Sequence, residues 1–493
     1  MRKLIAVFLL VFMAFSAAPT YSADYEATWE SLDQRPVAKW FEDSKFGIFI
    51  HWGPYSVPAF TPKGTYSEWY QHWLQNKSLS GNGKFTGTEV YDYHRKTYGE
   101  HFPYYKFGEQ FKADLFDAQE WAGLFKRAGA KYIVITSKHH DGYCLWPNKQ
   151  ANDRGFAWNS MDVGSKRDLL GELTPAVKDA GIKMGFYYSL YEWYHPWWQN
   201  DKERFVKEHF HPQVKDLVER YQPDILWGDG EWSMEAEKWK SQELLAWLFN
   251  ESSVKDTIVI NDRWGKGVRQ HHGGYFTTEY DATADYAKPW EECRGMGFSF
   301  GYNQNEDADD YNPPQVLILM LADIVSHGGN LLLDIGPDGR GSIPVIMQER
   351  LIQMGEWLEV NGDAIYGTRK WERSTQWSDG DRNYKPDKQS YLGGEYILKL
   401  MVNPEPGYAT KEIIFTSKED TLFAMTPRWP GKELVVKDVS PSKDCIVEFL
   451  ATREKLEWKE RDGNMVIDMP DFDPNQIAPE LQYLYVFKIN GLK

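Results

Sequence analysis

Cysteine is scarce in this sequence: Cys144, Cys293 and Cys445 are the only three among 493 residues. Three widely spaced thiols cannot form the disulfide framework of a small secreted domain. They also provide no cluster of the kind that binds a structural zinc ion. We expect three buried thiols, although pairing of two of them stays open. A large apolar core must therefore stabilise the fold, and a chain of this length can form one.

Long apolar runs are missing after the first 22 residues, so we expect no membrane-spanning segment. Residues 1–22 have the pattern of a signal peptide, with Arg2 and Lys3, an apolar run from Leu4 to Phe15, and small residues before a cleavage site after Ser22. No cysteine follows to carry a lipid. We expect an exported protein without a membrane anchor, periplasmic or extracellular, or in a lysosome-like compartment of a eukaryotic host.

Basic segments are absent as well, and the formal net charge is −16. This charge argues against nucleic acid or an anionic membrane as a partner. Aromatic residues, in contrast, make up 16% of the chain and include 22 tryptophans. Most of them belong in the core, but the remainder can stack on the apolar faces of sugar rings.

Helical and strand patterns alternate from about residue 38 to residue 360, which predicts a parallel sheet. We expect eight strands, at residues 46–51, 132–136, 184–189, 225–227, 257–260, 275–280, 298–302 and 331–335. Eight such units in a chain of this length predict a (β/α)₈ barrel of the TIM type. The barrel domain should span residues 23–367.

The pattern changes at about residue 368 to short alternating segments separated by turn residues, beginning with 396–402 and 412–416. This sequence pattern predicts a C-terminal antiparallel β-sandwich over residues 368–493. Its sequence shows no obvious platform for sugars, so we expect a supporting role.

One stretch in the middle of the barrel stands out, reading Asp-Ile-Leu-Trp-Gly-Asp-Gly-Glu-Trp from Asp224 to Trp232. A buried strand ends there in Asp229, and the glycines on both sides allow a sharp turn. The carboxylate therefore lies at the carboxyl end of a parallel strand, where barrels carry their catalytic residues. A helix-capping aspartate is the alternative interpretation.

Other unusual polar residues also follow expected strands and should meet at the same end of the barrel: His51, His139, His140, Tyr188, Asp229 and Arg263. They are spread over more than 200 residues of sequence. Their shared position at strand ends predicts one active site.

Several motifs, in order through the expected barrel, resemble the α-L-fucosidases of glycoside hydrolase family 29. They are Lys45-Phe-Gly-Ile-Phe-Ile-His-Trp-Gly-Pro-Tyr-Ser56, Ser67-Glu-Trp-Tyr70, Lys138-His-His-Asp-Gly142, Trp158-Asn-Ser160, Arg167-Asp-Leu-Leu170, Tyr187-Tyr-Ser189, Trp227-Gly-Asp229, Trp290-Glu-Glu-Cys293 and Gly328-Gly-Asn330. The chain departs from many relatives at Gly228, where they have asparagine, and at Phe300, where they often have tryptophan.

The resemblance implies a retaining exo-α-L-fucosidase that removes terminal fucose from a fucosylated glycan by way of a fucosyl-aspartate intermediate. Asp229 matches the family nucleophile and Glu291 the general acid/base. Positions that hold the fucose ring match His51, Glu68, Trp69, His139, His140, Tyr188, Trp227 and Arg263. We expect neither a metal nor a cofactor. The sequence does not indicate the oligomeric state or the preferred linkage.

The acid/base assignment has competitors, because Glu279 and Glu292 lie near Glu291. Neighbouring residues of an extended segment point in opposite directions, so Glu291 and Glu292 should not both face the pocket. Two other functions stay open. One is a metallohydrolase with His51, His139, His140 and an aspartate as ligands; the other is an inactive secreted carbohydrate-binding protein.

Overall fold

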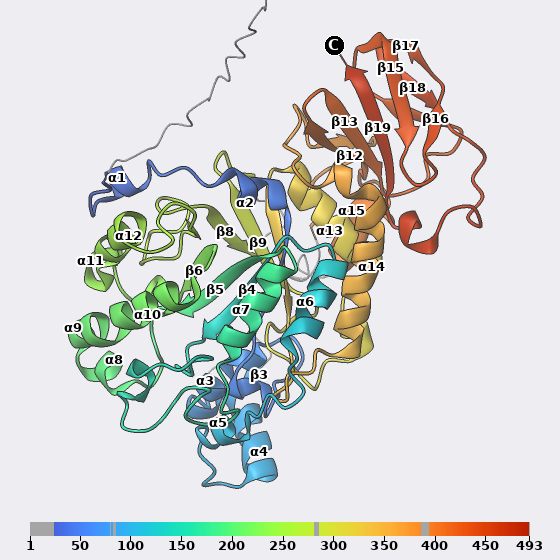
Figure 1. The fold of residues 1–493 in the computed structure, drawn as a ribbon. Helices are drawn as coiled ribbons and strands as arrows, with labels where there is room; N and C mark the ends of the chain where they lie inside the picture. Colours follow the sequence, from blue (N-terminus) through green and yellow to red (C-terminus); the bar gives the residue numbers. More distant parts are fainter. Residues whose placement is uncertain (1–23, 79, 82–84, 281–284, 386–393, 493) are drawn as a thin grey trace, which may run out of the picture.

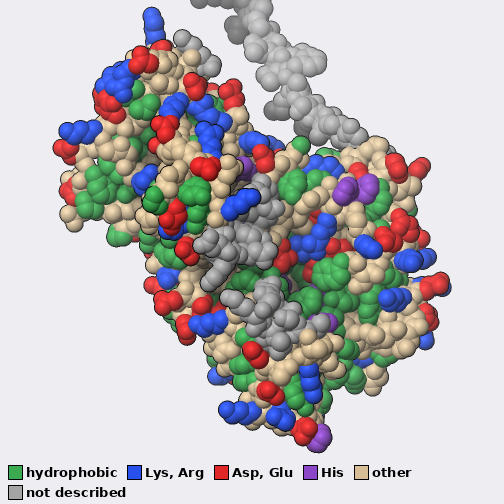
Figure 2. Space-filling view, turned by 180° about the vertical axis from the view of Figure 1, so that it is seen from behind, with side chains coloured by type: hydrophobic (Ala, Val, Ile, Leu, Met, Phe, Trp, Pro, Cys, Tyr) green, Lys and Arg blue, Asp and Glu red, His purple; other side chains and the backbone are tan. Residues whose placement is uncertain are grey.

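The computed structural model describes residues 24–492 except 79, 82–84, 281–284 and 386–393 (Figure 1). The predicted signal peptide, residues 1–22, lies outside the described residues. Among the helices that are described, none is both long and apolar enough to cross a membrane. Figure 2 shows acidic and basic side chains interspersed over the described part of one face.

The larger part of the chain is a curled sheet of eight parallel strands surrounded by helices (Figure 1). In spatial order the strands are β7 (Val259–Ile260), β6 (Ile225–Asp229), β5 (Lys183–Ser189), β4 (Tyr132–Lys138), β1 (Phe46–Ile50), β10 (Asn330–Ile335), β9 (Trp290–Gly295) and β8 (Phe276–Glu279). The predicted barrel is confirmed, and seven of the eight predicted strands coincide with observed ones.

The outer helices follow the strands as expected for a barrel. They are α6 (Ala118–Arg127), α7 (Leu169–Asp179), α10 (His211–Tyr221), α12 (Ser241–Asn250), α13 (Pro314–Ser326) and α14 (Val345–Asn361). Asp117 caps α6 by accepting hydrogen bonds from two backbone N–H groups of the first turn, those of Gln119 and Glu120.

Backbone hydrogen bonds close the ring between β7 and β8. The N–H of Tyr275 donates to the carbonyl of Ile260 at 3.1 Å, and that of Gly274 to the carbonyl of Asn261 at 3.2 Å. A Cβ atom on Gly274 would lie 1.9 Å from the Ile260 carbonyl oxygen. Only glycine therefore allows the two chain segments to approach this closely.

The strand predicted at residues 298–302 is wrong, because the chain forms β9 at Trp290–Gly295 instead. All six residues of β9 are buried, including Glu291, Glu292 and Arg294. Burial of these charged groups is possible because they are paired: Arg294 Nε donates to Glu292 Oε1 at 2.8 Å. A hydropathy pattern does not detect such a strand.

The C-terminal part consists of antiparallel sheets, as predicted. One has six strands in the order β11 (Thr375–Trp377), β12 (Lys411–Lys418), β13 (Thr421–Thr426), β19 (Tyr485–Leu492), β15 (Pro441–Phe449) and β16 (Glu454–Leu456). The other contains β14 (Glu433–Val436), β18 (Asn464–Asp468) and β17 (Trp458–Arg461). The predicted strand at 396–402 is wrong: helix α15 (Gly394–Met401) forms there, and it buries Ile397, Leu400 and Met401 at helical spacing.

The C-terminal sheets lie beside the outer helices α13 and α14 of the barrel (Figure 1), and buried contacts join the two parts. Lys411 of β12 forms an ion pair with Asp323 of α13. The indole Nε1 of Trp357 in α14 donates to the carbonyl of Leu484 at 3.0 Å. The sheets thus pack on α13 and α14, away from the carboxyl ends of the barrel strands.

Candidate active site

A cavity of about 260 Å³ lies at the carboxyl ends of the barrel strands. It is lined by Phe49, His51, Tyr66, Glu68, Trp69, His139, His140, Tyr187, Trp227, Asp229, Trp232, Arg263, Arg269, Glu279, Cys293 and Phe300. Eight of the ten residues that the sequence predicted for the site are in this set. The two exceptions are Tyr188 and Glu291.

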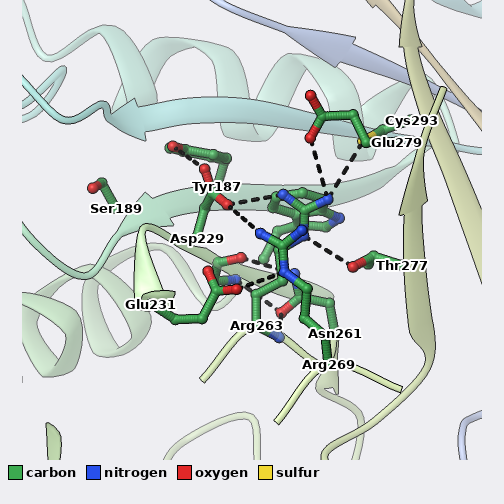
Figure 3. Close-up of polar contacts among 12 residues, drawn as sticks. Tyr187, Ser189, Asp229, Glu231, Asn261, Arg263, Arg269, Thr277, Glu279 and Cys293 are labelled. Atoms are coloured by element: carbon green, nitrogen blue, oxygen red, sulfur yellow. Dashed lines mark hydrogen bonds and ion pairs between the residues drawn. The ribbon is translucent and has the colours of Figure 1, made fainter. Parts of the chain in front are cut away.

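Asp229, the last residue of β6, makes charged and polar contacts through both carboxylate oxygens (Figure 3). Its Oδ1 accepts a hydrogen bond from Arg263 Nη1 at 2.8 Å, and its Oδ2 accepts one from the Tyr187 hydroxyl at 2.8 Å. Arg269 Nη2 lies 3.5 Å from Oδ1, and His140 Nε2 lies 3.7 Å from Oδ2. The carboxylate is therefore fixed in one orientation at the wall of the cavity.

The surroundings of Asp229 keep it ionised. Burial by itself would raise the pKa of this carboxyl, but the positive charges of Arg263 and Arg269 outweigh burial and lower the pKa to about 2. A carboxylate that is buried and still ionised at neutral pH is suited to act as a nucleophile.

The three predicted histidines lie side by side in the cavity. Burial lowers the pKa of His51 and of His140 to about 3, and that of His139 well below its usual value, so all three rings are neutral at neutral pH. Partners orient two of the rings: His51 Nδ1 lies 2.6 Å from Asp334 Oδ1, and His140 Nδ1 lies 2.6 Å from Ser189 Oγ.

The third ring, that of His139, differs from the other two. His139 Nδ1 is buried and has no hydrogen-bond partner among the described residues. A buried polar atom without a partner is costly. Other atoms of the ring line the cavity, which makes His139 a candidate contact to the substrate.

Glu68 lines the cavity as predicted and is held by the segment that follows β9. The backbone N–H of Gly301 donates to its Oε2 at 2.8 Å. Burial raises the pKa of Glu68 to about 8, although this hydrogen bond opposes the shift. At neutral pH the group is therefore a protonated carboxyl that can donate a hydrogen bond.

The tryptophans Trp69 and Trp227 also line the cavity as predicted. The Arg263 guanidinium lies over the Trp227 ring, with its carbon 4.4 Å from the ring centroid. Trp69 packs edge-on against the His140 ring at a centroid distance of 5.6 Å. Both residues provide apolar surface to the cavity in addition to their packing.

Tyr188 does not line the cavity, and the prediction that it contacts the ligand is contradicted by its orientation. Its hydroxyl donates to Gln213 Oε1 of α10 at 2.7 Å, outside the barrel. The neighbouring Tyr187 points inward to Asp229. Successive side chains of a strand alternate between its two faces, so Tyr187 and Tyr188 point to opposite sides of β5.

Glu291 is buried beneath the cavity rather than facing it, which contradicts the expected position of an acid/base. Its carboxyl accepts hydrogen bonds from the Tyr132 hydroxyl at 2.6 Å and from Trp227 Nε1 at 2.9 Å. Burial raises its pKa to about 7. Glu292 points to the other face of β9 and contacts Thr278 and Arg294, so the expected opposite orientation of the two glutamates is confirmed.

Sheet register explains the depth of Glu291. In the pairing of β8 with β9, Glu291 is opposite Thr277, whereas Cys293 is opposite Glu279. Cys293 and Glu279 line the cavity, and Glu291 lies two residues earlier on the same face of β9. Two residues of a strand span roughly 6.6 Å, which puts Glu291 one layer of side chains lower in the barrel.

Glu279 is the further carboxyl that the structure brings into the cavity (Figure 3). Its Oε2 lies 3.6 Å from Arg263 Nη2, and its Oε1 accepts a hydrogen bond from the Tyr66 hydroxyl at 3.3 Å. The same guanidinium therefore contacts both Asp229 and Glu279. The position of Glu279 at the end of a predicted strand was the sequence feature that pointed to it.

Arg269 and Trp232 also line the cavity, and neither was predicted as a site residue. Arg269 follows β7 by nine residues and reaches back to Asp229, while its Nε donates to Glu231 Oε1 at 2.5 Å. The long loop after β7 places Arg269, and no local pattern in the sequence marks it. Trp232 lies three residues after Asp229, at the end of the stretch Asp224–Trp232.

The metal-site interpretation receives no geometric support from the cavity. Among the described residues, Glu192, His195 and His209 form the one group whose ligand atoms are close enough to share an ion, and this group excludes the cavity histidines. Both oxygens of Glu192 already contact cations, Lys138 on one side and Arg154 on the other. Such a site does not fit a further cation.

The three cysteines are free and buried, as expected.

Comparisons with known proteins agree with this geometry. The sequence model of the family described as "Alpha-L-fucosidase" matches residues 12–363, and that of the "Alpha-L-fucosidase C-terminal domain" matches residues 407–490. Together these matches cover the barrel and most of the C-terminal sheets.

Individual relatives match over nearly their whole length. Tissue α-L-fucosidase of Rattus norvegicus is 43% identical, over 98% of this chain and 97% of the relative. Tissue α-L-fucosidase of Homo sapiens is 36% identical, over 95% of this chain and 92% of the relative. A crystal structure of Thermotoga maritima α-fucosidase, in complex with a mechanism-based inhibitor, superimposes with a TM-score of 0.75 at 36% identity, covering 94% of this chain and 100% of that one. The chain therefore belongs to the α-L-fucosidase family of glycoside hydrolases.

Proposed function

We propose that this protein hydrolyses the α-linked L-fucose at the end of a glycan, with retention of configuration at the anomeric carbon. The observation that carries the proposal is the pair Asp229 and Glu279, two carboxyl groups that contact one guanidinium in a cavity with neutral histidines. Retaining glycosidases use one such group as nucleophile and the other as acid and base.

In the first step Asp229 attacks the anomeric carbon and forms a fucosyl ester. Glu279 gives a proton to the departing glycosidic oxygen. In the second step Glu279 takes a proton from water, which attacks the ester and releases Asp229. Glu279 replaces Glu291 in this assignment because Glu291 lies one layer below the cavity, where Trp227 and Tyr132 occupy its oxygens.

The remaining cavity residues fit the recognition of one sugar. His51, His139, His140 and Glu68 offer hydrogen-bond donors and acceptors for ring hydroxyls, and Trp69, Trp227 and Phe300 offer apolar surface for the ring and its methyl group. The volume of about 260 Å³ is below the roughly 300–1,000 Å³ of sites for drug-sized ligands, which favours a single terminal residue.

Time-resolved NMR of the products tests this function. With an aryl α-L-fucoside as substrate, we expect α-L-fucose to form first and the β-anomer to accumulate later by mutarotation. Initial formation of the β-anomer would exclude retention, and absence of fucose release would exclude the activity.

We also propose export of the protein and a catalytic unit at residues 23–367 supported by residues 368–493. The N-terminal apolar run and a relative named plasma α-L-fucosidase, 37% identical over 97% of this chain, support export. Edman sequencing of the protein from the source organism tests this, and a mature chain that begins at Ala23 is the expected result.

A further inference from the structure

Three markedly exposed residues of the cavity lining lie at or after neighbouring strand ends. Trp232 exposes 40% of its surface, and the side chains of Arg269 and Glu279 expose 35% and 32%. The histidines and Glu68, by comparison, are at most 4% exposed. The three exposed residues come from the ends of β6, β7 and β8 or from the loops after them, and these strands are consecutive along the chain.

A second hollow begins at one of these exposed residues. It is a groove of about 500 Å³, and Trp232 lines both the groove and the catalytic cavity. The groove continues over Ser233 to Lys202, Lys238, Lys240 and Lys266. Its lining includes these four lysines and three glutamates, next to the exposed indole of Trp232.

We propose that this groove, which we call the Trp232 groove, binds the leaving-group part of the substrate as an oligosaccharide of two or more sugar residues. This inference rests on the proposed function and names the substrate class of the same site. The catalytic cavity has room for one sugar, so the rest of a glycan must lie outside it. The leaving group departs past Glu279, and Arg269 and Trp232 continue the same exposed rim.

The chemistry of the groove matches that of a sugar chain. An exposed aromatic face packs on the apolar C–H surface of a pyranose ring. Lysine ammonium groups donate hydrogen bonds and carboxylates accept them, so a lining that contains both can bind the ring hydroxyls. The Arg269 guanidinium lies 5.9 Å from the Trp232 ring centroid and 3.5 Å from Asp229, which places it at the junction of the two hollows.

Substrates with short and long leaving groups test the proposal. α-L-Fucosyl fluoride releases a single atom, whereas a fucosylated tetrasaccharide releases a trisaccharide that would occupy the groove. The quantity to measure is the ratio of kcat/KM for the tetrasaccharide to kcat/KM for the fluoride. This ratio cancels effects on the fucose cavity that are common to both substrates.

Two variants address the groove in different ways. Trp232→Ala removes the stacking surface, and we expect the ratio to fall about tenfold, as loss of one aromatic contact predicts. Ser233→Trp fills the groove with a bulky ring, and we expect a fall of at least threefold. Phe472→Ala is the matched control, since Phe472 is 41% exposed but belongs to the C-terminal part, and its ratio should equal that of the wild type.

Ratios within twofold of the wild type in both groove variants would overturn the proposal. A fall of the ratio for Trp232→Ala alone would restrict substrate binding to the indole and would also overturn the proposal that the groove binds the leaving group. These results differ from failure of the proposed function, in which the wild-type protein cleaves neither substrate. Circular dichroism of each variant shows that the fold is retained.

Discussion

Two layers of the barrel interior, one above the other, both contain a glutamate, and their surroundings differ. In the upper layer Glu279 contacts the Arg263 guanidinium and the Tyr66 hydroxyl at the open cavity. In the lower layer Glu291 is closed off from solvent and bonded to a phenol and an indole. The residues are close in sequence, and sheet register alone assigns them to different layers.

A second contrast, between Asp229 and Glu291, shows what sets the charge of a buried carboxyl. Burial raises the pKa of both groups. At Asp229 nearby positive charges reverse the effect, and the pKa is about 2; at Glu291 the donors are mainly neutral, and the pKa is about 7. The upper layer therefore holds a nucleophile that is ready to react, whereas the lower layer holds a structural acid.

The largest effect should come from removing the nucleophile of the upper layer. We expect Asp229→Ala to lower kcat by a factor of about 10⁴–10⁶, comparable to the loss of the key residues in other covalent hydrolases. Azide can take the place of the missing carboxylate and should give the fucosyl azide with inverted configuration. A variant that keeps a tenth of the wild-type rate would show that Asp229 is not the nucleophile.

Removing the upper glutamate should have the second-largest effect. We expect Glu279→Ala to lower kcat/KM by roughly 10²–10⁴ on a substrate with a poor leaving group, the usual contribution of a general acid. On an aryl fucoside with a good leaving group the fucosyl ester still forms, but its hydrolysis is slow because no general base activates the water. Azide needs no base, so it should restore turnover and yield the azide with retained configuration.

The matched control for Glu279 is Glu292→Ala, which alters a buried glutamate on the other face of β9. Azide should not accelerate this variant. If Glu291→Ala, rather than Glu279→Ala, gives the retained azide, the lower layer contains the acid/base and our assignment fails.

Two adjacent tyrosines of β5 allow a similar comparison between the inside and the outside of the barrel. Tyr187→Phe removes a hydrogen bond to the charged Asp229, worth about 1.5–3 kcal/mol, so kcat/KM should fall roughly ten- to a hundredfold. Tyr188→Phe removes a bond to Gln213 and should lower the free energy of unfolding by about 1 kcal/mol without changing kinetics. Equal kinetic losses in the two variants would contradict this separation of the faces.

Glu291→Ala should act on stability more than on turnover. Without this carboxyl, the Tyr132 hydroxyl and Trp227 Nε1 lose their buried acceptor, and each unsatisfied donor costs about 1–3 kcal/mol. Thermal unfolding should show a clearly lower Tm. We expect kcat to remain within tenfold of the wild type, and a larger loss with an unchanged Tm would indicate a direct role in the reaction.

Periodicity and resemblance predicted most of the architecture correctly. Apolar strands such as β1 and β10 are buried along their whole length, so hydropathy identifies them. Strand β9 was missed because its charged residues are compensated by partners from other strands, and such pairing is not visible in the local sequence. Helix α15 was missed because a short apolar segment fits both a strand and a helix.

The same limits apply to the site. Residues at strand ends, such as His51 and Asp229, were predicted from the fold itself. Tyr188 does not line the cavity but its neighbour Tyr187 does, because a shift of one residue reverses the face of a strand. Glu291 lies one layer below the cavity, and a motif carries no information on depth until the register of β8 with β9 is known. Arg269 could not be placed at the site from the sequence, because its position depends on the path of the long loop after β7.

The smallest expected effect concerns Glu68, another carboxyl of the cavity. Burial raises its pKa to about 8, so it stays protonated at lower pH. Below that pH its hydroxyl can donate to a sugar; above it, the group becomes an anion near Glu279. We therefore expect kcat/KM of the wild type to decline above pH 8, and Glu68→Gln, which stays a neutral donor, to lose less than tenfold at pH 7 and to lack this decline.

Stability provides an independent reading of the same ionisation. Burial raises the pKa of Glu68 in the folded protein above the ordinary value of 4.5. The contribution of Glu68 to the free energy of unfolding is therefore fully present below about pH 4.5 and is lost as the pH rises through about 8. The difference in Tm between Glu68→Gln and the wild type should therefore shift in favour of the variant from pH 5 to pH 9. An unchanged difference in Tm, together with the same alkaline decline of kcat/KM in both proteins, would assign that decline to a group other than Glu68.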